Sequence, residues 1–576
     1  MPYKVGISSG WWSIAKDPAL LGLPIKAGGY GATSGVQFNQ LDLEGVIEFV
    51  EPQLKKQIER MQRELGIELG LHGEIGEHAA LESAERRIWE LSHERLATAI
   101  KHAADLKFKY INIHFSSTLQ LQQRERELRP FGWSYQVVNP FGRPFYELAE
   151  ENSEAGRKVK EFIMRRMQTG SGIQRVLQEE EIFQDKWNAF STKETEKERT
   201  EARKRIDEGW YVNPQNPARH VPPGTTDPSI VESVRQIVHT DRQNSGEWNA
   251  LVLQFFYSLW KDPQCNIGKY VLEAGEIDAS LATAVYMYHK NEPLWFNIVG
   301  GVHPETAYTT KPKEFNAATT AYYIKGHLEA KHPANDQLLG GARLIDYLNR
   351  NGLILTMETP QSGQGTEGLS RMYDPIDGYH LVKSIGSSKV KLCIDFEQVM
   401  GQNIDIDKMF ASGRMPGDFG KEVVLIHLGE PIPYFGTAHI PISIGGRGQE
   451  ILYGWLFELR KRGFKDGYML FERGGGRGGE GGGATAFKVF EYSVWVLRQM
   501  SKYLDLNVEP KALPPEFFGI SVNNKDIWAT QVINMREHAW DPLKDLLVLP
   551  EETHTFLSKA AVEKGKGEVW ERRKYR

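Results

Sequence analysis

The chain has 576 residues, which is longer than one hydrophobic core ordinarily supports, so we expect a large domain with an insertion or several domains. Its 40% apolar and 25% charged residues are typical of a folded soluble protein, and no apolar run approaches the roughly 20 residues of a membrane span. The net charge of -5 gives no overall signature of nucleic-acid binding. With only Cys265 and Cys393, and no secretory signal pattern at the start, we expect a cytoplasmic protein.

Short apolar segments alternate with helical patterns at both ends of the chain. Before residue 118 we predict strands at 4–10, 67–73 and 108–117, with helices over 42–66 and 80–107. After residue 352 we predict strands at 353–360, 390–398, 423–430, 439–446 and 468–475, and a last helix over 484–506. Three strands before the interruption and five after it make eight. The sequence therefore predicts an α/β fold, a (β/α)8 TIM barrel that is interrupted after its third strand.

The middle of the chain has a different character. Residues 118–338 show no regular alternation of strands and helices, and so long a structureless connection is improbable in a compact domain. We predict a mainly helical inserted subdomain there, between barrel segments 1–117 (strands 1–3) and 339–506 (strands 4–8), followed by a C-terminal extension, 507–576. The insertion is a candidate surface for a protein partner.

Polar side chains follow the predicted strands where each one ends. These residues are His72, His114, Glu358, Asp395, His427, His439 and Glu472. In a TIM barrel the carboxyl ends of all eight strands converge on one cavity. A single residue of this kind is more often structural, but several buried carboxylates together would be costly without cations to neutralise them. Imidazole and carboxylate ligands suit Zn²⁺, with Mn²⁺ or Fe²⁺ as alternatives.

The segments that carry these residues resemble the strand-end motifs of one family. LHG at 71–73, INIHFSS at 111–117, METPQSGQG at 357–365, CIDFEQ at 393–398, IHLGE at 426–430, AHIPISIGG at 438–446 and LFERGG at 470–475 are similar to those of the endonuclease IV family (AP endonuclease family 2). This family belongs to the xylose-isomerase-like TIM barrels, and its zinc site cleaves DNA at abasic positions. The resemblance covers only the barrel, about residues 1–117 and 340–505.

The resemblance implies two complete metal sites. One would use His72, His114 and bridging Glu358, and the other Glu358, Asp395, His427 and Glu472. We therefore expect two divalent ions, Zn²⁺ or alternatively Mn²⁺.

The third metal site of the family is incomplete in this sequence. Gln398 and Thr437 replace two of its ligands and leave His439 alone, as a metal ligand or a contact to substrate phosphate. The insertion offers further histidines, namely His220, His239, His289 and His303, but nothing in the sequence brings them to the site.

Two divalent ions about 4 Å apart can activate a water molecule and stabilise both oxygens of a phosphoryl transfer. We accordingly expect a metal-dependent phosphodiesterase acting on abasic or damaged DNA, with Glu358, Asp395 and Glu472 as catalytic residues. The glycine-rich turns at 445–448 and 472–483 are either phosphate-binding loops or flexible hinges. In the first case Arg447, Arg473 and Arg477 would contact substrate phosphate.

Two alternatives remain open. Glu358, Asp395, His427 and Glu472 are also similar to the single-metal set of sugar isomerases and epimerases of the same superfamily, in which Glu358 and Glu472 would act as acid and base. His72 and His114 favour the nuclease, because a single-metal epimerase has less need of them. The second alternative is a barrel without catalytic activity that acts as a scaffold.

Overall fold

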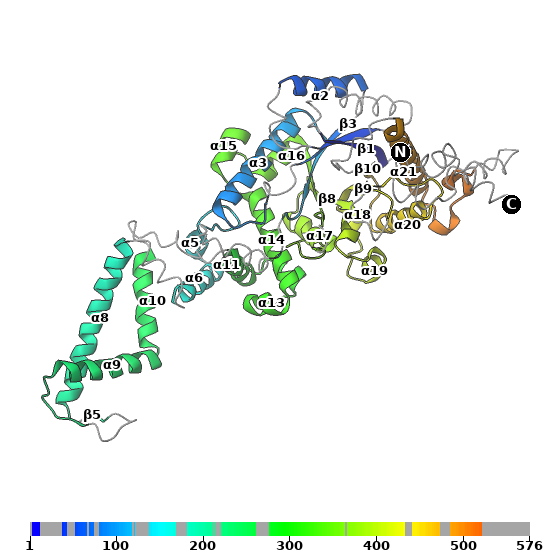
Figure 1. Cartoon of the computed structure of the whole chain (residues 1–576). Helices are drawn as coiled ribbons and strands as arrows, with labels where there is room; N and C mark the ends of the chain where they lie inside the picture. Colours follow the sequence, from blue (N-terminus) through cyan, green and yellow to red (C-terminus); the bar gives the residue numbers. More distant parts are fainter. Residues whose placement is uncertain are drawn as a thin grey trace, which may run out of the picture.

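The computed structural model in Figure 1 describes most of the barrel and most of the insertion. The residues described are 3–11, 37–42, 52–65, 68–73, 80–117, 120, 137–168, 181–209, 211–212, 220–260, 276–362, 366–431, 440–472 and 484–520. Among them, no helix is both long enough and apolar enough to cross a membrane.

Eight strands form a closed barrel, in the order β1-β10-β9-β8-β7-β4-β3-β2. They are β1 (Tyr3–Trp11), β2 (Phe38–Asp42), β3 (Glu68–His72), β4 (Tyr110–His114), β7 (Ile354–Glu358), β8 (Val390–Asp395), β9 (Val423–Leu428) and β10 (Gly467–Phe471). Every neighbouring pair is parallel. The predicted TIM barrel is confirmed.

The position of the insertion in the barrel differs from the prediction. Phe38–Asp42 forms the second strand, so four strands precede the insertion and four follow it. The prediction of an interruption after the third strand, with three strands in 1–117 and five in 339–506, was therefore wrong. This strand was missed because Asn39, Gln40 and Asp42 break its apolar character, and the helix expected to start at residue 42 is described only from Pro52.

The predicted strand at 439–446 was also wrong over the residues that the structure describes. Residues 440–446 contain no strand and lead into helix α20 (Arg447–Lys461). Their polar groups bond locally: the Glu430 amide donates to the Ile440 carbonyl (2.8 Å) and the Ser443 amide donates to Glu430 Oε2 (2.9 Å). The barrel closes without this segment, because β9 pairs directly with β10.

The alternation of side chains along the strands separates the inside of the barrel from its outside. Phe38, Tyr110, Cys393, Leu425 and Leu470 form a buried cluster of their own, distinct from the larger core under the helices. A Cβ at Gly70 of β3 would lie 2.1 Å from the Tyr110 ring, so the absence of a side chain there makes room for the tyrosine.

Helices surround the barrel. They are α2 (Pro52–Leu65), α3 (Arg86–Asp105), α16 (Leu344–Asn351), α17 (Pro375–Ile385), α18 (Phe396–Gly401), α19 (Ile406–Ala411), α20 and α21 (Ala484–Asp505), with a 3-10 turn, η6, at Phe419–Lys421. Helix α17 illustrates the local signals: the Asp374 carboxylate accepts from the Ile376 amide, Pro375 occupies the first turn, and Gly386 ends the helix in the left-handed conformation.

The insertion is mainly helical where it is described, as predicted. Its elements are α5 (Phe145–Ala149), α6 (Glu154–Gln168), α8 (Glu181–Asp207), β5 (Tyr211–Val212), β6 (His220–Val221), α9 (Pro228–Asn244), α10 (Glu247–Trp260), α11 (Glu276–His289), α12 (Pro293–Val299), α13 (Pro304–Thr310), α14 (Pro312–Glu329) and α15 (Pro333–Leu339). Helices α11 to α15 share the large core with the barrel helices, so this part is not a separate unit.

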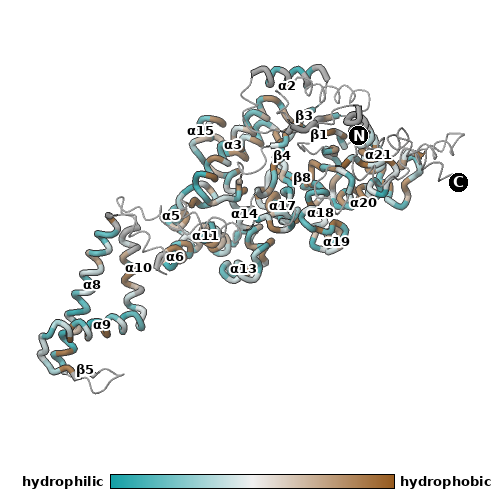
Figure 2. Tube along the Cα trace, viewed as in Figure 1, coloured by the Kyte–Doolittle hydropathy of each residue, from teal (hydrophilic) through white to brown (hydrophobic). Residues whose placement is uncertain are grey.

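Helices α8, α9 and α10 instead form an arm that extends away from the barrel (Figure 1). The arm has a small core of its own, made by Ala202, Ile206, Val231, Val234 and Val238. Many residues along α8 and α9 are hydrophilic (Figure 2), which agrees with the solvated helices that their balanced charges indicate.

The first residues of the predicted C-terminal extension pack against the barrel. Two short 3-10 turns, η7 (Pro510–Ala512) and η8 (Pro515–Phe518), follow α21, and Phe517 is buried between Tyr453 and Tyr503. Residues 521–576, the rest of that predicted extension, lie outside the described residues.

Candidate metal centre

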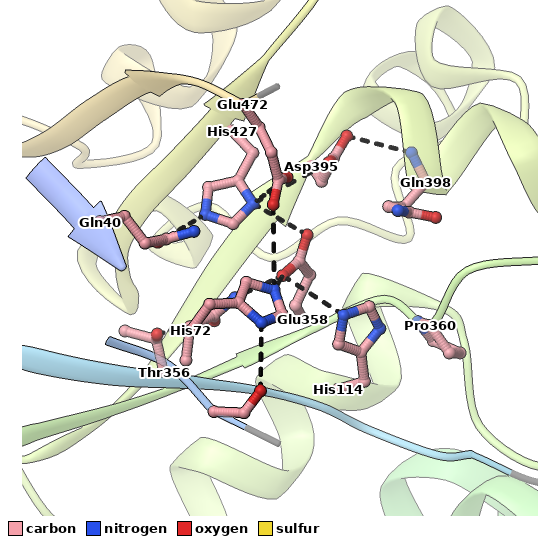
Figure 3. Close-up of polar contacts among 12 residues, drawn as sticks. Gln40, His72, His114, Thr356, Glu358, Pro360, Asp395, Gln398, His427 and Glu472 are labelled. Carbon is pink, nitrogen blue, oxygen red and sulfur yellow. Dashed lines mark hydrogen bonds and ion pairs between the residues drawn. The ribbon is translucent and has the colours of Figure 1, made fainter. Parts of the chain in front are cut away.

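Six of the seven predicted strand-end residues meet inside one end of the barrel (Figure 3). The strand register accounts for two of the contacts: His114 lies beside Glu358 across β4 and β7, and Asp395 lies beside His427 across β8 and β9. Three groups bring ligand atoms within 4.8 Å of one another: His72, His114 and Glu358; Glu358, Cys393 and His427; and Glu358, Asp395, His427 and Glu472.

His427 lies at the centre of the four-residue group. Its Nδ1 is 2.7 Å from Glu472 Oε2, 3.1 Å from Glu358 Oε1 and 3.9 Å from Asp395 Oδ2. The other oxygen of Asp395 caps α18, where it accepts from the amides of Glu397 (2.7 Å) and Gln398 (3.1 Å). Asp395 is thus both a helix cap and a member of the site, with one carboxylate oxygen for each task.

Glu358 lies between His427 on one side and the pair His72 and His114 on the other. Its Oε1 faces His427, while its Oε2 lies 3.6 Å from His72 Nε2 and 3.9 Å from His114 Nε2. Asn112, on β4 below His114, donates to the same Oε2. A carboxylate in this position can bridge two ions or hold one ion and one imidazole.

The hydrogen bonds of His427 fix its tautomer. Its Nε2 lies 3.2 Å from Gln40 Oε1, and the Tyr110 hydroxyl donates to the same oxygen (2.9 Å). Because that oxygen only accepts, Nε2 carries a proton; Nδ1 faces carboxylate oxygens, so it is also protonated without a metal ion, and a metal ion bound at Nδ1 would replace that second proton. This is how proteins orient a histidine ligand of a metal.

The site is almost closed to solvent. His427 is 0% exposed, Glu358 1%, Asp395 2% and Glu472 8%. Burial lowers the pKa of His114 to about 4, so this imidazole is neutral at pH 7 and able to bind a cation.

The charges of the site fit a divalent cation. Burial raises the pKa of Asp395 well above its usual value, and the neighbouring Glu358 and Glu472 add to this. Burial alone would lower the pKa of His427, but Cys393, Glu358 and Glu472 raise it well above its usual range. Protons on Asp395 and His427 therefore compensate charge that a metal ion would neutralise instead, and three carboxylates with an imidazole are suitable ligands for Zn²⁺ or Mn²⁺.

Of the remaining predicted site residues, Arg447 alone lies in the part of the chain that the structure describes, and it is not in any of these three groups. His439, Thr437, Arg473 and Arg477 lie outside the described residues, and Arg447 is exposed at the first residue of α20. Gln398 is buried in α18, at the position where the third metal site would need a histidine.

Three of the four insertion histidines make other contacts. His239 pairs with Glu198 in the arm (2.8 Å), and His289 and His303 both pack against Tyr288. His220 lies in the short strand β6.

Sequence reasoning missed Gln40, Asn112 and Cys393. Gln40 lies in the strand that was not predicted, and the other two lie one inward-facing position before His114 and Asp395 on the same strands. The period of two along a strand would have indicated Asn112 and Cys393 once the strand ends were known.

No protein-family model matches the chain, and no curated protein has a sequence that matches it. Solved structures resemble it only distantly. D-psicose 3-epimerase with D-tagatose from Clostridium cellulolyticum H10 has 10% identity and a TM-score of 0.38, over 87% of this chain and 99% of that one. L-ribulose 3-epimerase has 8% identity and a TM-score of 0.38, over 87% and 95%. The catalytic domain of β-amylase from Paenibacillus polymyxa has 11% identity and a TM-score of 0.34, over 89% and 99%.

Similarity at this level carries no argument about function, and membership of the endonuclease IV family is not shown by it. The function has to be argued from the side chains of the cluster.

Proposed function

We propose that the chain is a divalent-metal enzyme that isomerises or epimerises a small polyhydroxylated carbonyl compound. This was the alternative to the nuclease in the sequence analysis. The observation that carries it is the position of two glutamates: Glu358 on β7 and Glu472 after β10 reach the same nitrogen of His427 from strands that are not neighbours. A substrate bound at a metal ion in this group would lie beside both carboxylates.

Proton transfer is the task of these two glutamates. Burial alone would raise the pKa of Glu358, but the surrounding histidines, His427 first, hold it well below its usual value, so its carboxylate is ionised at pH 7. One glutamate removes the proton from the carbon beside the carbonyl group, and the other returns a proton at the opposite face or at the neighbouring carbon. The metal ion, when bound, would hold the substrate oxygens and polarise the carbonyl group.

The burial of the cluster favours a small substrate. Glu358 and Asp395 are at most 2% exposed, and Glu472 is 8% exposed. A small molecule bound beside these buried side chains would lose its surrounding water, which strengthens the electrostatic interactions at the reacting atoms. The net charge of -5 likewise gives no general attraction for a nucleic-acid duplex.

Deuterium exchange tests this proposal. Protein loaded with Mn²⁺ is incubated in D₂O with a panel of ketoses, aldoses and their phosphates, and NMR follows deuterium entering the carbon beside the carbonyl group. We expect exchange with at least one compound, and its loss in Glu358→Gln and Glu472→Gln. A matched control is Glu68→Gln, because Glu68 lies at the other end of the barrel, paired with Lys4. Metal-loaded protein that exchanges no compound of the panel would refute the proposal.

A second candidate is the metal-dependent phosphodiesterase expected from the sequence. The specific observation in its favour is that Glu358 presents one oxygen to His427 and the other to His72 and His114, as a ligand bridging two ions would. Two-ion hydrolysis of a phosphodiester needs such a pair of ions, whereas proton transfer at carbon does not.

Substitution of His114 separates the two candidates. His114→Ala removes one ligand of the second ion and leaves the four-residue group intact, so a phosphodiesterase would lose its activity and a single-metal isomerase would keep most of its activity. The substrate for the hydrolytic assay is a labelled duplex with one abasic analogue, beside an intact duplex. Cleavage of the abasic duplex that depends on both the metal and His114 would favour the nuclease.

A further inference from the structure

A buried network of charged and hydroxyl side chains links the insertion to the end of the barrel that holds the cluster. Its centre is the ion pair between Arg371, in the connection after β7, and Glu276, the first residue of α11. Glu276 is 4% exposed and Arg371 is 3% exposed. Neither residue is a member of the candidate metal-binding groups.

Glu276 also holds the segment between β3 and α3. Its Oε1 accepts from the Ser83 hydroxyl (2.6 Å) and from the Ala84 amide (3.2 Å). Arg371 Nη1 donates a hydrogen bond to the backbone carbonyl of the preceding residue, Glu82 (3.1 Å). One carboxylate of the insertion is thus bonded to the connections that follow two different barrel strands.

Glu82 extends the network to a third strand. Its Oε1 accepts from the Ser116 hydroxyl (3.1 Å) and the Ser117 amide (2.7 Å). These serines lie two and three residues after His114. The Phe115 amide, between His114 and these serines, donates to the Glu358 carbonyl (2.8 Å). The segments in the network therefore follow β3, β4 and β7, which carry His72, His114 and Glu358.

From these contacts we infer that Glu276 and Arg371 are positioning residues for the His72, His114 and Glu358 side of the metal centre. A buried ion pair is a weak device for stability, since its desolvation offsets most of the attraction, but its directional bonds define geometry. Residues that hold the segments next to metal ligands help to fix the geometry of those ligands. Glu276 of the insertion thus supports the geometry of the site without being a metal ligand. This inference rests on the proposed metal site.

The test compares Glu276→Gln with a matched substitution in the arm. Glu276→Gln keeps an acceptor for Ser83 and Ala84 but removes the charge that holds Arg371, and we expect Mn²⁺ to bind several-fold more weakly. The control is Glu198→Gln, because Glu198 is also buried, at 2% exposed, and its Oε2 accepts from Arg235 (2.7 Å) far along the chain from the site. The control should leave Mn²⁺ affinity unchanged.

A double variant separates positioning from folding. Glu276→Gln with Arg371→Met replaces the ion pair by neutral groups, which should recover thermal stability lost in the single variant. The Mn²⁺ affinity should remain low, and hydrogen exchange at residues 82–84 and 115–117 should remain faster than in the natural protein. Recovery of full Mn²⁺ affinity with stability would overturn the inference.

The outcome also distinguishes this inference from the proposed function. If the natural protein binds no Mn²⁺, the proposed metal site fails, and unchanged exchange in residues 115–117 of Glu276→Gln would independently overturn the network. If the natural protein binds Mn²⁺ and Glu276→Gln binds it equally well, only the positioning role is refuted.

Discussion

Three histidines where the barrel meets the insertion predict a loss of stability in mild acid. His93 of α3 and His327 of α14 are both 0% exposed, and each stacks on Trp89. His93 Nε2 lies 2.9 Å from Asn335 Oδ1, and the Asn335 amide nitrogen is itself bonded to the Ala330 carbonyl. His93 Nε2 is therefore the donor, and its Nδ1 accepts a hydrogen bond from His327 Nδ1 at 3.2 Å.

Protonation of His93 would place a second donor against His327. Burial, opposed by the hydrogen bond to Asn335 and assisted by the nearby His332, lowers the pKa of His93 to about 4 from a usual value of 6.5. A folded-state pKa below the unfolded one means that the stabilisation is present above pH 6.5 and is lost as the pH falls toward 4. For these two values, the free energy of unfolding should decrease by about 2 kcal/mol between pH 7.5 and pH 5 from this one residue.

Urea unfolding followed by circular dichroism at the two pH values measures this loss. The comparison is with His93→Gln, which keeps a donor for Asn335 but does not titrate. The pH-dependent loss should be about 2 kcal/mol smaller in the variant, because the side chain at position 93 no longer takes up a proton. Equal losses in the two proteins would refute the reasoning.

Three further predictions concern the metal centre. Gln40→Leu removes the acceptor that orients His427, so Mn²⁺ affinity in calorimetry should fall about 10-fold to 100-fold; an unchanged affinity would contradict the assigned tautomer. Mn²⁺ affinity should rise with pH, and protons should be released on binding, because the pKa values of Asp395 and His427 are raised in the protein without metal; calorimetry in two buffers of different ionisation heat counts these protons, and a count of zero would be inconsistent with the site. Glu358→Gln should abolish stoichiometric Mn²⁺ binding while Glu68→Gln keeps it, with metal analysis after gel filtration as the measurement.

Local sequence patterns were sufficient to predict the barrel and most of the side-chain cluster at its end. Continuous apolar runs identified seven of the eight strands, and a polar residue directly after such a run predicted Glu358, Asp395 and His427 correctly as neighbours. The fold then brings these residues together, because the carboxyl ends of the parallel strands in a barrel converge.

The failures have physical causes of two kinds. Phe38–Asp42 is a strand whose inward side carries Gln40, a residue that bonds His427 and therefore cannot be apolar. The segment 440–446 has the apolar pattern of a strand but forms a loop, because its backbone hydrogen-bonds to Glu430 and not to a neighbouring strand. The pair of Glu276 and Arg371 could not be predicted, because 95 residues separate them and each lies in an irregular stretch or at a helix start.

The most direct test of the account is to locate a bound metal ion. Crystals of the protein grown with Mn²⁺ and measured at the manganese absorption edge give an anomalous difference map that identifies the ion and its ligands. The account predicts a peak bound by Glu358, Asp395, His427 and Glu472, the group whose ligand atoms lie within 4.8 Å of one another. A map with no peak among these four side chains would contradict it.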